Sequence, residues 1–168
     1  MIDYLFGRGR GFIYFSFLVA FIFQIFPLFE WLNYLRPLWV LLLMLYWIQV
    51  APSKLGVVSA FFVGLFMDVL FDDVLGMHAM VMSLLGFIVH LFHRRLRVFS
   101  NVQQVLLVFI LSIFYLLILR ILQGFFAGPV TSNFGYWLPA LSGALVWPWF
   151  KLVMNEIKAR INIYEPSH

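Results

Sequence analysis

The segment Gly56-Val-Val-Ser-Ala60-Phe-Phe-Val-Gly64-Leu-Phe-Met-Asp68 places a small residue at every fourth position of an apolar run, and an acid at the next such position. Residues four apart share one face of a helix, so the segment predicts a helix with a groove of small residues that ends in a carboxylate. A charge within a membrane helix costs at least a few kcal/mol and normally faces protein instead of lipid. The segment therefore predicts a closely packed helix in a helical membrane protein.

The composition of the whole chain favours the same class. The chain has 168 residues, of which 64% are hydrophobic and 11% charged, whereas a soluble domain is about half apolar and a quarter charged. We therefore predict an all-α integral membrane protein with several spans. The absence of cysteine excludes disulfides and thiolate metal sites. We attribute the net charge of +4 to membrane topology and not to nucleic-acid binding.

The apolar runs and the breaks between them predict six transmembrane helices. Their expected ranges are 11–30, 36–51, 55–71, 75–92, 102–126 and 134–153. These spans form one transmembrane domain over residues 1–154, and residues 155–168 are predicted to be a short cytoplasmic tail. The first run is longer than the core of a signal peptide and no small-residue cleavage site follows it, so we expect it to be retained. Pro52 ends the second span.

The basic residues predict the orientation. Nine of the eleven Lys and Arg residues fall on the side of the bundle that carries both termini, namely Arg8, Arg10, Lys54, Arg94, Arg95, Arg97, Lys151, Lys158 and Arg160. Basic residues concentrate on the cytoplasmic side of a membrane protein. Both termini are therefore predicted to be cytoplasmic.

Asp68 has two interpretations. It is either an intramembrane acid that serves ion coupling, a ligand or a partner helix, or an internal group that fixes helix packing. Arg120 is a candidate partner for the second interpretation, because the third and fifth spans run in the same direction and reach these residues at comparable depth. The sequence leaves open whether Asp68 pairs with Arg120, since Arg120 can also extend to the outer surface alone.

Two further patterns point to helix packing. The fourth span carries small residues at intervals of three and four, namely Gly76, Ala79, Ser83 and Gly86. We expect this face to pack against the groove of the third span, as in small-xxx-small association. The sixth span contains Trp147-Pro148-Trp149, in which the proline predicts a kink and the indoles either pack inside or face a partner.

No constellation for catalysis or metal binding is present. His90 and His93 are neighbours but lack the further ligands that a metal site requires. The chain contains no nucleophile–base pair, phosphate-binding loop or metalloprotease motif. We therefore predict that the protein is not an enzyme and has no cofactor.

The order of these features resembles that of the rod shape-determining protein MreD family over nearly the whole chain. The residues that carry the resemblance are Arg36-Pro37-Leu-Trp39, Tyr46-Trp47, Pro52, Gly56, Phe61, Gly64-Leu65, Asp68-Val-Leu, Leu75-Gly76, Gln103-Gln104 and Leu145-Val-Trp147-Pro148-Trp149.

The resemblance implies a non-enzymatic component of the bacterial elongation (rod) complex in the cytoplasmic inner membrane. Expected partners are MreC, MreB, RodA, the elongation-specific penicillin-binding transpeptidase and membrane lipids, in support of lateral peptidoglycan synthesis and rod shape. The family fold is also similar to the substrate-binding subunit of energy-coupling-factor transporters. The main alternative is therefore a membrane transport subunit that binds a small molecule or an amphiphile, and a proton-coupled carrier using Asp68 is a weaker one.

These interpretations predict two groups of site residues. Residues expected to be structural are Gly56, Ala60, Gly64, Asp68, Gly76, Ser83, Gly86 and Pro148. Residues expected to contact a partner or ligand are Arg36, Asp68, Asp72, Asp73, Arg120, Trp147 and Trp149.

Overall fold

The computed structural model describes residues 8–27, 29, 34–126, 128 and 134–161, and all regular structure in that part is helical. It contains six α-helices and one short 3-10 helix: α2 (Arg8–Ile25), α4 (Trp39–Val50), α5 (Val57–Phe71), α6 (Met77–Val98), α7 (Asn101–Phe126), η1 (Phe134–Trp137) and α8 (Leu138–Ile161). The predicted all-α class is confirmed, and the six helices follow in the predicted order.

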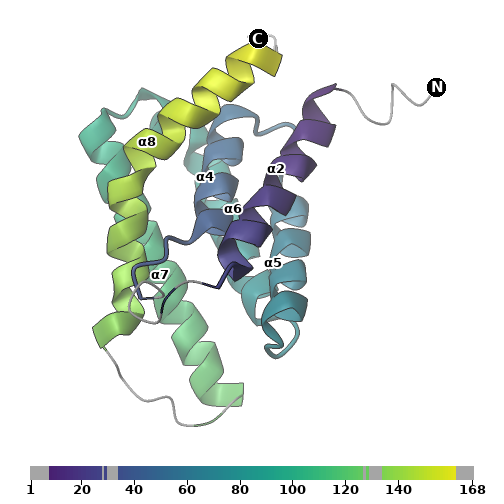
Figure 1. Ribbon diagram of the computed structural model, residues 1–168, viewed down its shortest axis with the longest axis vertical. Helices are drawn as coiled ribbons and strands as arrows, with labels where there is room; N and C mark the ends of the chain where they lie inside the picture. Colours follow the sequence, from purple (N-terminus) through teal and green to yellow (C-terminus); the bar gives the residue numbers. More distant parts are fainter. Residues whose placement is uncertain (1–7, 28, 30–33, 127, 129–133, 162–168) are drawn as a thin grey trace, which may run out of the picture.

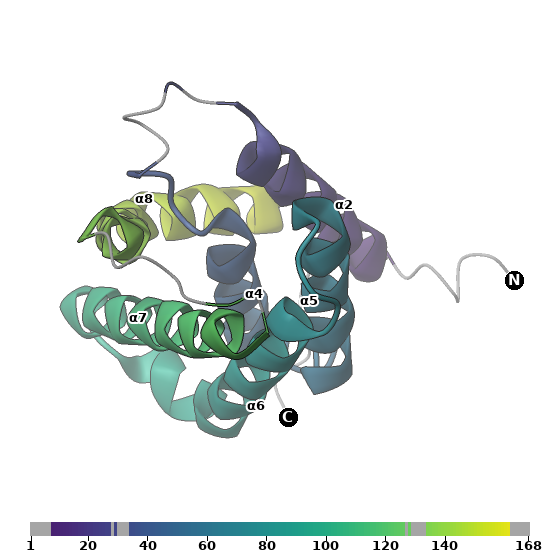
Figure 2. The same ribbon diagram turned by 90° about the horizontal axis from the view of Figure 1, so that it is seen from below.

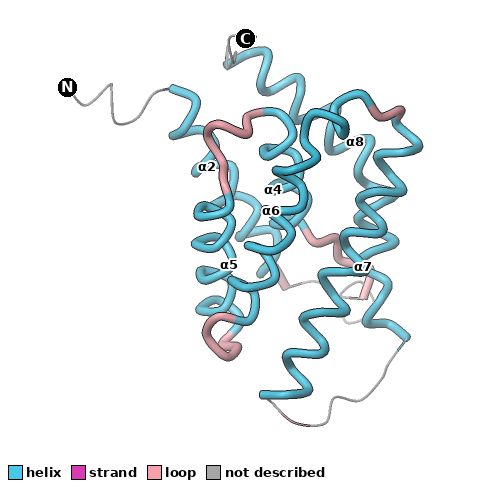
Figure 3. Tube along the Cα trace, turned by 180° about the vertical axis from the view of Figure 1, so that it is seen from behind, coloured by secondary structure: helices cyan, strands magenta, loops and turns pink. Residues whose placement is uncertain are grey.

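Successive helices run in alternate directions, so the start of α2 and the end of α8 lie at the same end of the bundle (Figure 1). The last turns of α6 and α8 also lie there, and they carry Arg95, Arg97, Lys158 and Arg160. We call this the basic end. The turn between α5 and α6 lies at the opposite end, which we call the turn end (Figure 3).

Helix α4 is the centre of the bundle (Figure 2). Ten consecutive residues, Val40 to Gln49, are buried, and α4 contacts α2, α6 and α8. A helix that is apolar on all sides is stable only when it is surrounded. Its 12 residues extend about 18 Å at 1.5 Å per residue, less than the ~30 Å hydrocarbon thickness of a bilayer. The burial of ten consecutive residues shows that neighbouring helices cover α4 on all sides.

Helices α5 and α6 pack closely because small residues lie where their backbones approach. A Cβ atom added to Gly64 would lie 2.5 Å from the Cα of Ala79, and one added to Gly86 would lie 2.8 Å from the Cβ of Ala60. Ser83, on the same helix, turns its hydroxyl back to the carbonyl of Ala79 at 2.6 Å. Larger side chains at Gly64 or Gly86 would force the two helices apart.

Prolines and caps explain where helix ends differ from the predicted spans. Helix α2 stops at Ile25 and not near residue 30. The reason is that Pro27 disfavours the helical conformation at the residue before it. Helix α4 begins at Trp39, after Pro37, and not at residue 36. Helix α6 continues to Val98, beyond the predicted end at residue 92. Ser100 and Gln103 then form a capping box for α7: the Ser100 N–H donates to Oε1 of Gln103 at 3.0 Å, and the Gln103 N–H donates to Oγ of Ser100 at 3.4 Å.

Helix α8 continues to Ile161, so the first residues of the predicted tail are helical. Its last turns carry Glu156 and Arg160, which pair at 3.2 Å one turn apart and so support an exposed helix. The rest of the predicted tail, and the end of the predicted first span, lie outside the described residues.

In the described part of the chain, α6 and α7 are the two helices long and apolar enough to cross a membrane by length and composition. Residues Gly11–Ile25 of α2, together with α4 and α5, are apolar but shorter. The topology with six spans and cytoplasmic termini stays a prediction.

Candidate functional site

Asp68 caps the N-terminus of α6 from the preceding helix. Its Oδ1 atom accepts the backbone N–H of His78 at 2.7 Å, and its Oδ2 atom accepts those of Gly76 at 2.8 Å and Ala79 at 3.3 Å. The first N–H groups of a helix have no partner within the helix, and they carry the positive end of its dipole. The fully buried carboxylate therefore satisfies backbone donors that lipid could not satisfy.

The turn between the two helices positions this carboxylate. Asp72 ends α5 with φ of 53°, in the left-handed region, and Gly76 begins α6 with φ of +102°. Glycine adopts such a φ without strain, and Asp does so at a small cost. These two residues reverse the chain within five positions, which brings the backbone of α6 onto Asp68.

His78 completes the environment of Asp68. Its Nδ1 atom lies 3.0 Å from Oδ1 of Asp68 and 3.7 Å from Oδ2 of Asp73. The imidazole also lies near the rings of Phe71 and Tyr115, with centroid distances of 5.7 and 6.2 Å. His78 is not among the site residues that the sequence predicts. The sequence feature that could have identified it is its place ten residues after Asp68, across a short turn.

Arg120 contacts η1, the short 3-10 helix that precedes α8. Its guanidinium lies 4.8 Å from the centroid of the Tyr136 ring, and the Tyr136 hydroxyl donates to the carbonyl of Leu116 at 2.9 Å. Among the described residues, the ion pairs of Asp68 run to His78 and not to Arg120. Asp68 and Arg120 therefore act at neighbouring but separate junctions, one between α5 and α6 and the other between α7 and η1.

Two arginines cap helix C-termini. The guanidinium of Arg36 donates to the carbonyls of Gln24 and Phe26 at the end of α2. That of Arg97 donates to the carbonyls of Gln49 and Val50 at the end of α4. A cation at this position satisfies orphan carbonyls and complements the helix dipole. Arg36 thus has a structural role inside the chain besides the partner or ligand contact that we predicted.

A polar network joins three helices near the basic end. The side-chain amide of Gln104 donates to the carbonyl of Phe99 at 3.1 Å, and its oxygen accepts the Nζ of Lys151 at 2.8 Å and the indole Nε1 of Trp147 at 3.5 Å. Trp147 is 1% exposed and Trp149 is 74% exposed. The two indoles on either side of Pro148 therefore face opposite environments: one packs in the core and the other is available to lipid or a partner.

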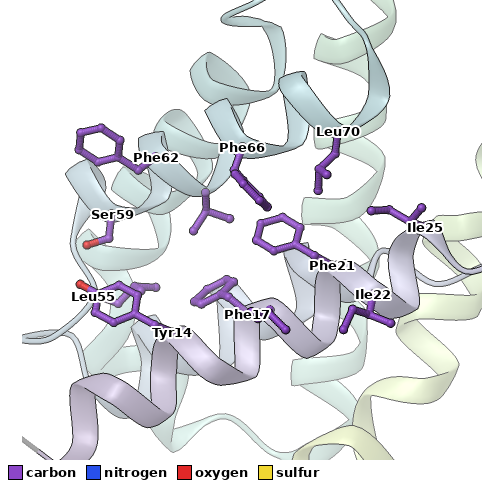
Figure 4. Close-up of a pocket in the computed structure, with 12 residues that line it drawn as sticks. Tyr14, Phe17, Phe21, Ile22, Ile25, Leu55, Ser59, Phe62, Phe66 and Leu70 are labelled. Carbon is purple, nitrogen blue, oxygen red and sulfur yellow. The ribbon is translucent and has the colours of Figure 1, made fainter. Parts of the chain in front are cut away.

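Helix α2 is bordered by an open apolar groove on each side. The groove between α2 and α5 has a volume of about 630 Å³ and is lined by aromatic and aliphatic side chains such as Phe17, Phe62 and Phe66 (Figure 4). The groove between α2 and α8 has a volume of about 430 Å³. In the first groove, Tyr14 and Phe62 are both more than half exposed. Such surfaces need a cover of lipid or of another apolar segment.

The described residues thus provide helix-packing contacts and open apolar grooves. No group of three or more His, Asp or Glu side chains among them is placed to hold a metal ion. The polar groups Asp68, Arg36 and Arg97 are engaged with backbone atoms of the chain itself. The arrangement is suited to hold helices in fixed positions and to present apolar grooves.

Comparisons with known proteins agree with one another. The sequence model of a family described as rod shape-determining protein MreD matches residues 8–157. The rod shape-determining protein MreD of Haemophilus influenzae is 30% identical over 151 residues, which cover 88% of this chain and 91% of that protein. No solved structure matches the chain.

Proposed function

The chain belongs to the MreD family of rod shape-determining proteins, and on that premise we propose that it binds MreC in the bacterial inner membrane and supports lateral peptidoglycan synthesis. MreD proteins determine cell shape as structural proteins and are not enzymes. In the proposed role the chain is a helical scaffold. MreB, RodA and the elongation-specific transpeptidase assemble with it directly or through MreC.

We propose a topology of six spans with both termini in the cytoplasm. The alternate directions of the six helices support it, because the basic last turns of α6 and α8 then lie at one end of the bundle. That end would face the cytoplasm. The short, buried α4 would be carried within the membrane by the helices around it.

The groove between α2 and α5 is the feature that carries the docking proposal. An apolar helix of MreC would lie along it, which is the helix-in-groove mode of recognition. Of the described residues that line the groove, only Tyr14 and Ser59 carry a side-chain polar atom. Phe21 and Phe66 meet at 4.8 Å between centroids and connect the two walls. A wall of rings and branched aliphatic side chains suits an apolar helix.

The alternative, a transport subunit for a small molecule, requires several polar groups that converge on an open cavity. Here the polar groups at the turn end are engaged elsewhere. Asp68 caps α6, Arg36 caps α2 and Arg120 lies on the Tyr136 ring. The two large grooves are apolar. These contacts favour a scaffold over a binder of polar solutes.

Co-purification tests the proposal. The tagged chain is expressed with MreC of the same organism, extracted in mild detergent, and the amount of bound MreC is measured. Phe62→Ala is expected to lower MreC recovery by about fivefold to tenfold, since the loss of a buried aromatic contact costs about 1–1.4 kcal/mol in affinity. The matched control is Phe87→Ala, which removes a ring that is 50% exposed on α6 and does not line the groove.

Equal recovery in both variants would exclude this groove as the docking site. Failure of the unchanged chain to retain MreC would overturn the proposed function. Recovery of energy-coupling ATPase subunits in place of MreC would support the transport alternative.

A further inference from the structure

A polar pocket lies between the start of α7 and the second half of α8, and we propose that it binds the phosphate group of an anionic membrane phospholipid. The pocket has a volume of about 230 Å³. Asn101 and Gln104 contribute to it from α7, and Trp147, Lys151 and Asn155 from α8. Its lining is far more polar than that of the grooves beside α2, so it suits a different kind of ligand.

Lys151 gives the pocket its charge. The ammonium group is half-buried, and it donates one hydrogen bond to the neutral amide oxygen of Gln104 at 2.8 Å. Within the described part of the chain, no acidic residue lines this pocket. The nearest acid along α8, Glu156, pairs with Arg160. Because removing a cation from water is costly without a counter-charge, the pocket favours an anion that accepts the remaining N–H groups.

Neighbouring amides are oriented to assist. The NH₂ group of Gln104 is used by the carbonyls of Leu96 and Phe99, so its oxygen points to Lys151 and holds the ammonium in place. The Oδ1 atom of Asn155 accepts the hydroxyl of Tyr46 at 2.8 Å, which leaves its NH₂ group as a donor. Together with exposed Asn101 at the rim, the pocket offers one ammonium and two amide donors, which suit the oxygens of a phosphate.

The depth of the pocket favours a lipid as the source of the phosphate, an argument that depends on the membrane placement proposed above. Lys151 lies about 20 Å along α8 from Leu138, past the middle of a hydrocarbon layer about 30 Å thick, and a lysine side chain at this depth extends toward the headgroups. The neighbouring Trp149 is 74% exposed, as expected of an indole at headgroup level. The helix continues beyond this level to Ile161. The pocket would therefore open at the inner headgroup layer.

Native mass spectrometry of the purified full chain in detergent tests the proposal. Phosphatidylglycerol and phosphatidylcholine are added separately, and the fraction of protein that retains one lipid is compared. The unchanged chain is expected to retain phosphatidylglycerol about tenfold better, the gain expected from one charge-assisted contact of about 1.4 kcal/mol. Lys151→Gln should abolish this preference. Lys158→Gln, two turns further along α8, should leave it unchanged.

A second variant separates loss of lipid binding from loss of folding. Asn101→Asp places a carboxylate beside Lys151, and an acid in the first turn of α7 favours the helix. It should melt at the same temperature or higher while losing the preference for phosphatidylglycerol. Retention of the preference in Lys151→Gln or in Asn101→Asp would overturn the proposal, as would an equal loss in Lys158→Gln.

Inorganic phosphate separates the two sources of the ligand. If millimolar phosphate leaves the lipid bound, the lipid is the ligand, as proposed. If phosphate displaces it, the site recognises phosphate alone and the lipid source is wrong. The assay contains no MreC, so its outcome is independent of the co-purification experiment.

Discussion

Asp68 and His78 are joined twice across the turn between α5 and α6. One oxygen of the carboxylate accepts the backbone N–H of His78 at 2.7 Å and lies 3.0 Å from its ring Nδ1. The acid in the apolar segment is thus a cap for the next helix. The relationship explains how a carboxylate can be fully buried, because its acceptor capacity is satisfied by backbone and ring N–H groups.

Replacement of Asp68 should destabilise the hairpin. In Asp68→Ala the N–H groups of Gly76, His78 and Ala79 lose their acceptor, and loss of a cap together with buried unsatisfied donors costs about 2–3 kcal/mol. We expect a clearly lower melting temperature in detergent, followed by circular dichroism. The control is Asp72→Asn, which removes an exposed acid from the same turn at a left-handed position that Asn tolerates. Equal melting of the two variants would contradict the capping role.

A methyl group at Gly64 should separate α5 from α6. Its Cβ would lie 2.5 Å from the backbone of Ala79, and overpacking of this kind costs about 1–3 kcal/mol. Gly124→Ala in α7 is the matched control, since a Cβ there meets nothing within 4 Å and alanine is the better helix former. Thermal melting should fall for Gly64→Ala and stay constant or rise for Gly124→Ala. The opposite order would show that the helices do not approach as described.

The arginines at the end of α6 should differ in their effect on stability. Arg97 donates to two carbonyls at the end of α4, so Arg97→Ala should cost about 1–2 kcal/mol. Arg94 lies three residues earlier and is exposed, so Arg94→Ala should change stability by less than about 0.5 kcal/mol. Chemical unfolding in mixed micelles measures the difference. Equal unfolding midpoints for Arg97→Ala and Arg94→Ala would mean that these arginines contribute to membrane topology and not to stability.

The two tryptophans beside Pro148 should separate packing from surface contact. Trp147→Ala removes a buried ring and is expected to cost about 3–5 kcal/mol. Trp149→Ala removes an exposed ring and should leave the melting temperature unchanged. MreC recovery from the Trp149 variant then reports directly on whether this indole faces the partner. A stable Trp147→Ala protein would contradict the packing described for α8.

Much of the fold was predictable from the sequence because apolar runs, prolines and basic residues each have a direct physical effect. Six helices were expected, and the described residues form six α-helices and one short 3-10 helix. The ends were less accurate. Pro27 and Pro37 act on the residues before them, so α2 ends earlier and α4 begins later than the hydropathy alone indicates. The predicted spans stop before the charged last turns of α6 and α8, which are helical, because hydropathy detects apolar segments and not helix as such.

The polar contacts were less predictable because they depend on which helices meet. Periodicity placed Asp68 on the face with the small residues, but its contact with His78 requires the tight turn through Asp72 and Gly76. The capping roles of Arg36 and Arg97 depend on where α2 and α4 end in space. Charge counting assigned Arg97 to the cytoplasmic side, and Arg36 was predicted to contact a partner or ligand. Local sequence contains no information on the carbonyls that they reach.

The position of α4 has a consequence for how the protein is made. This second helix is enclosed by α2, α6 and α8, and the last of these is the final helix of the described chain. During synthesis, α4 therefore leaves the ribosome long before most of its neighbours exist. In the membrane topology proposed above, α4 would stay in lipid or beside the insertion machinery until they are made, because it is too short to span the bilayer alone. The core closes only when α8 arrives, so late truncations should expose α4 to quality-control proteases.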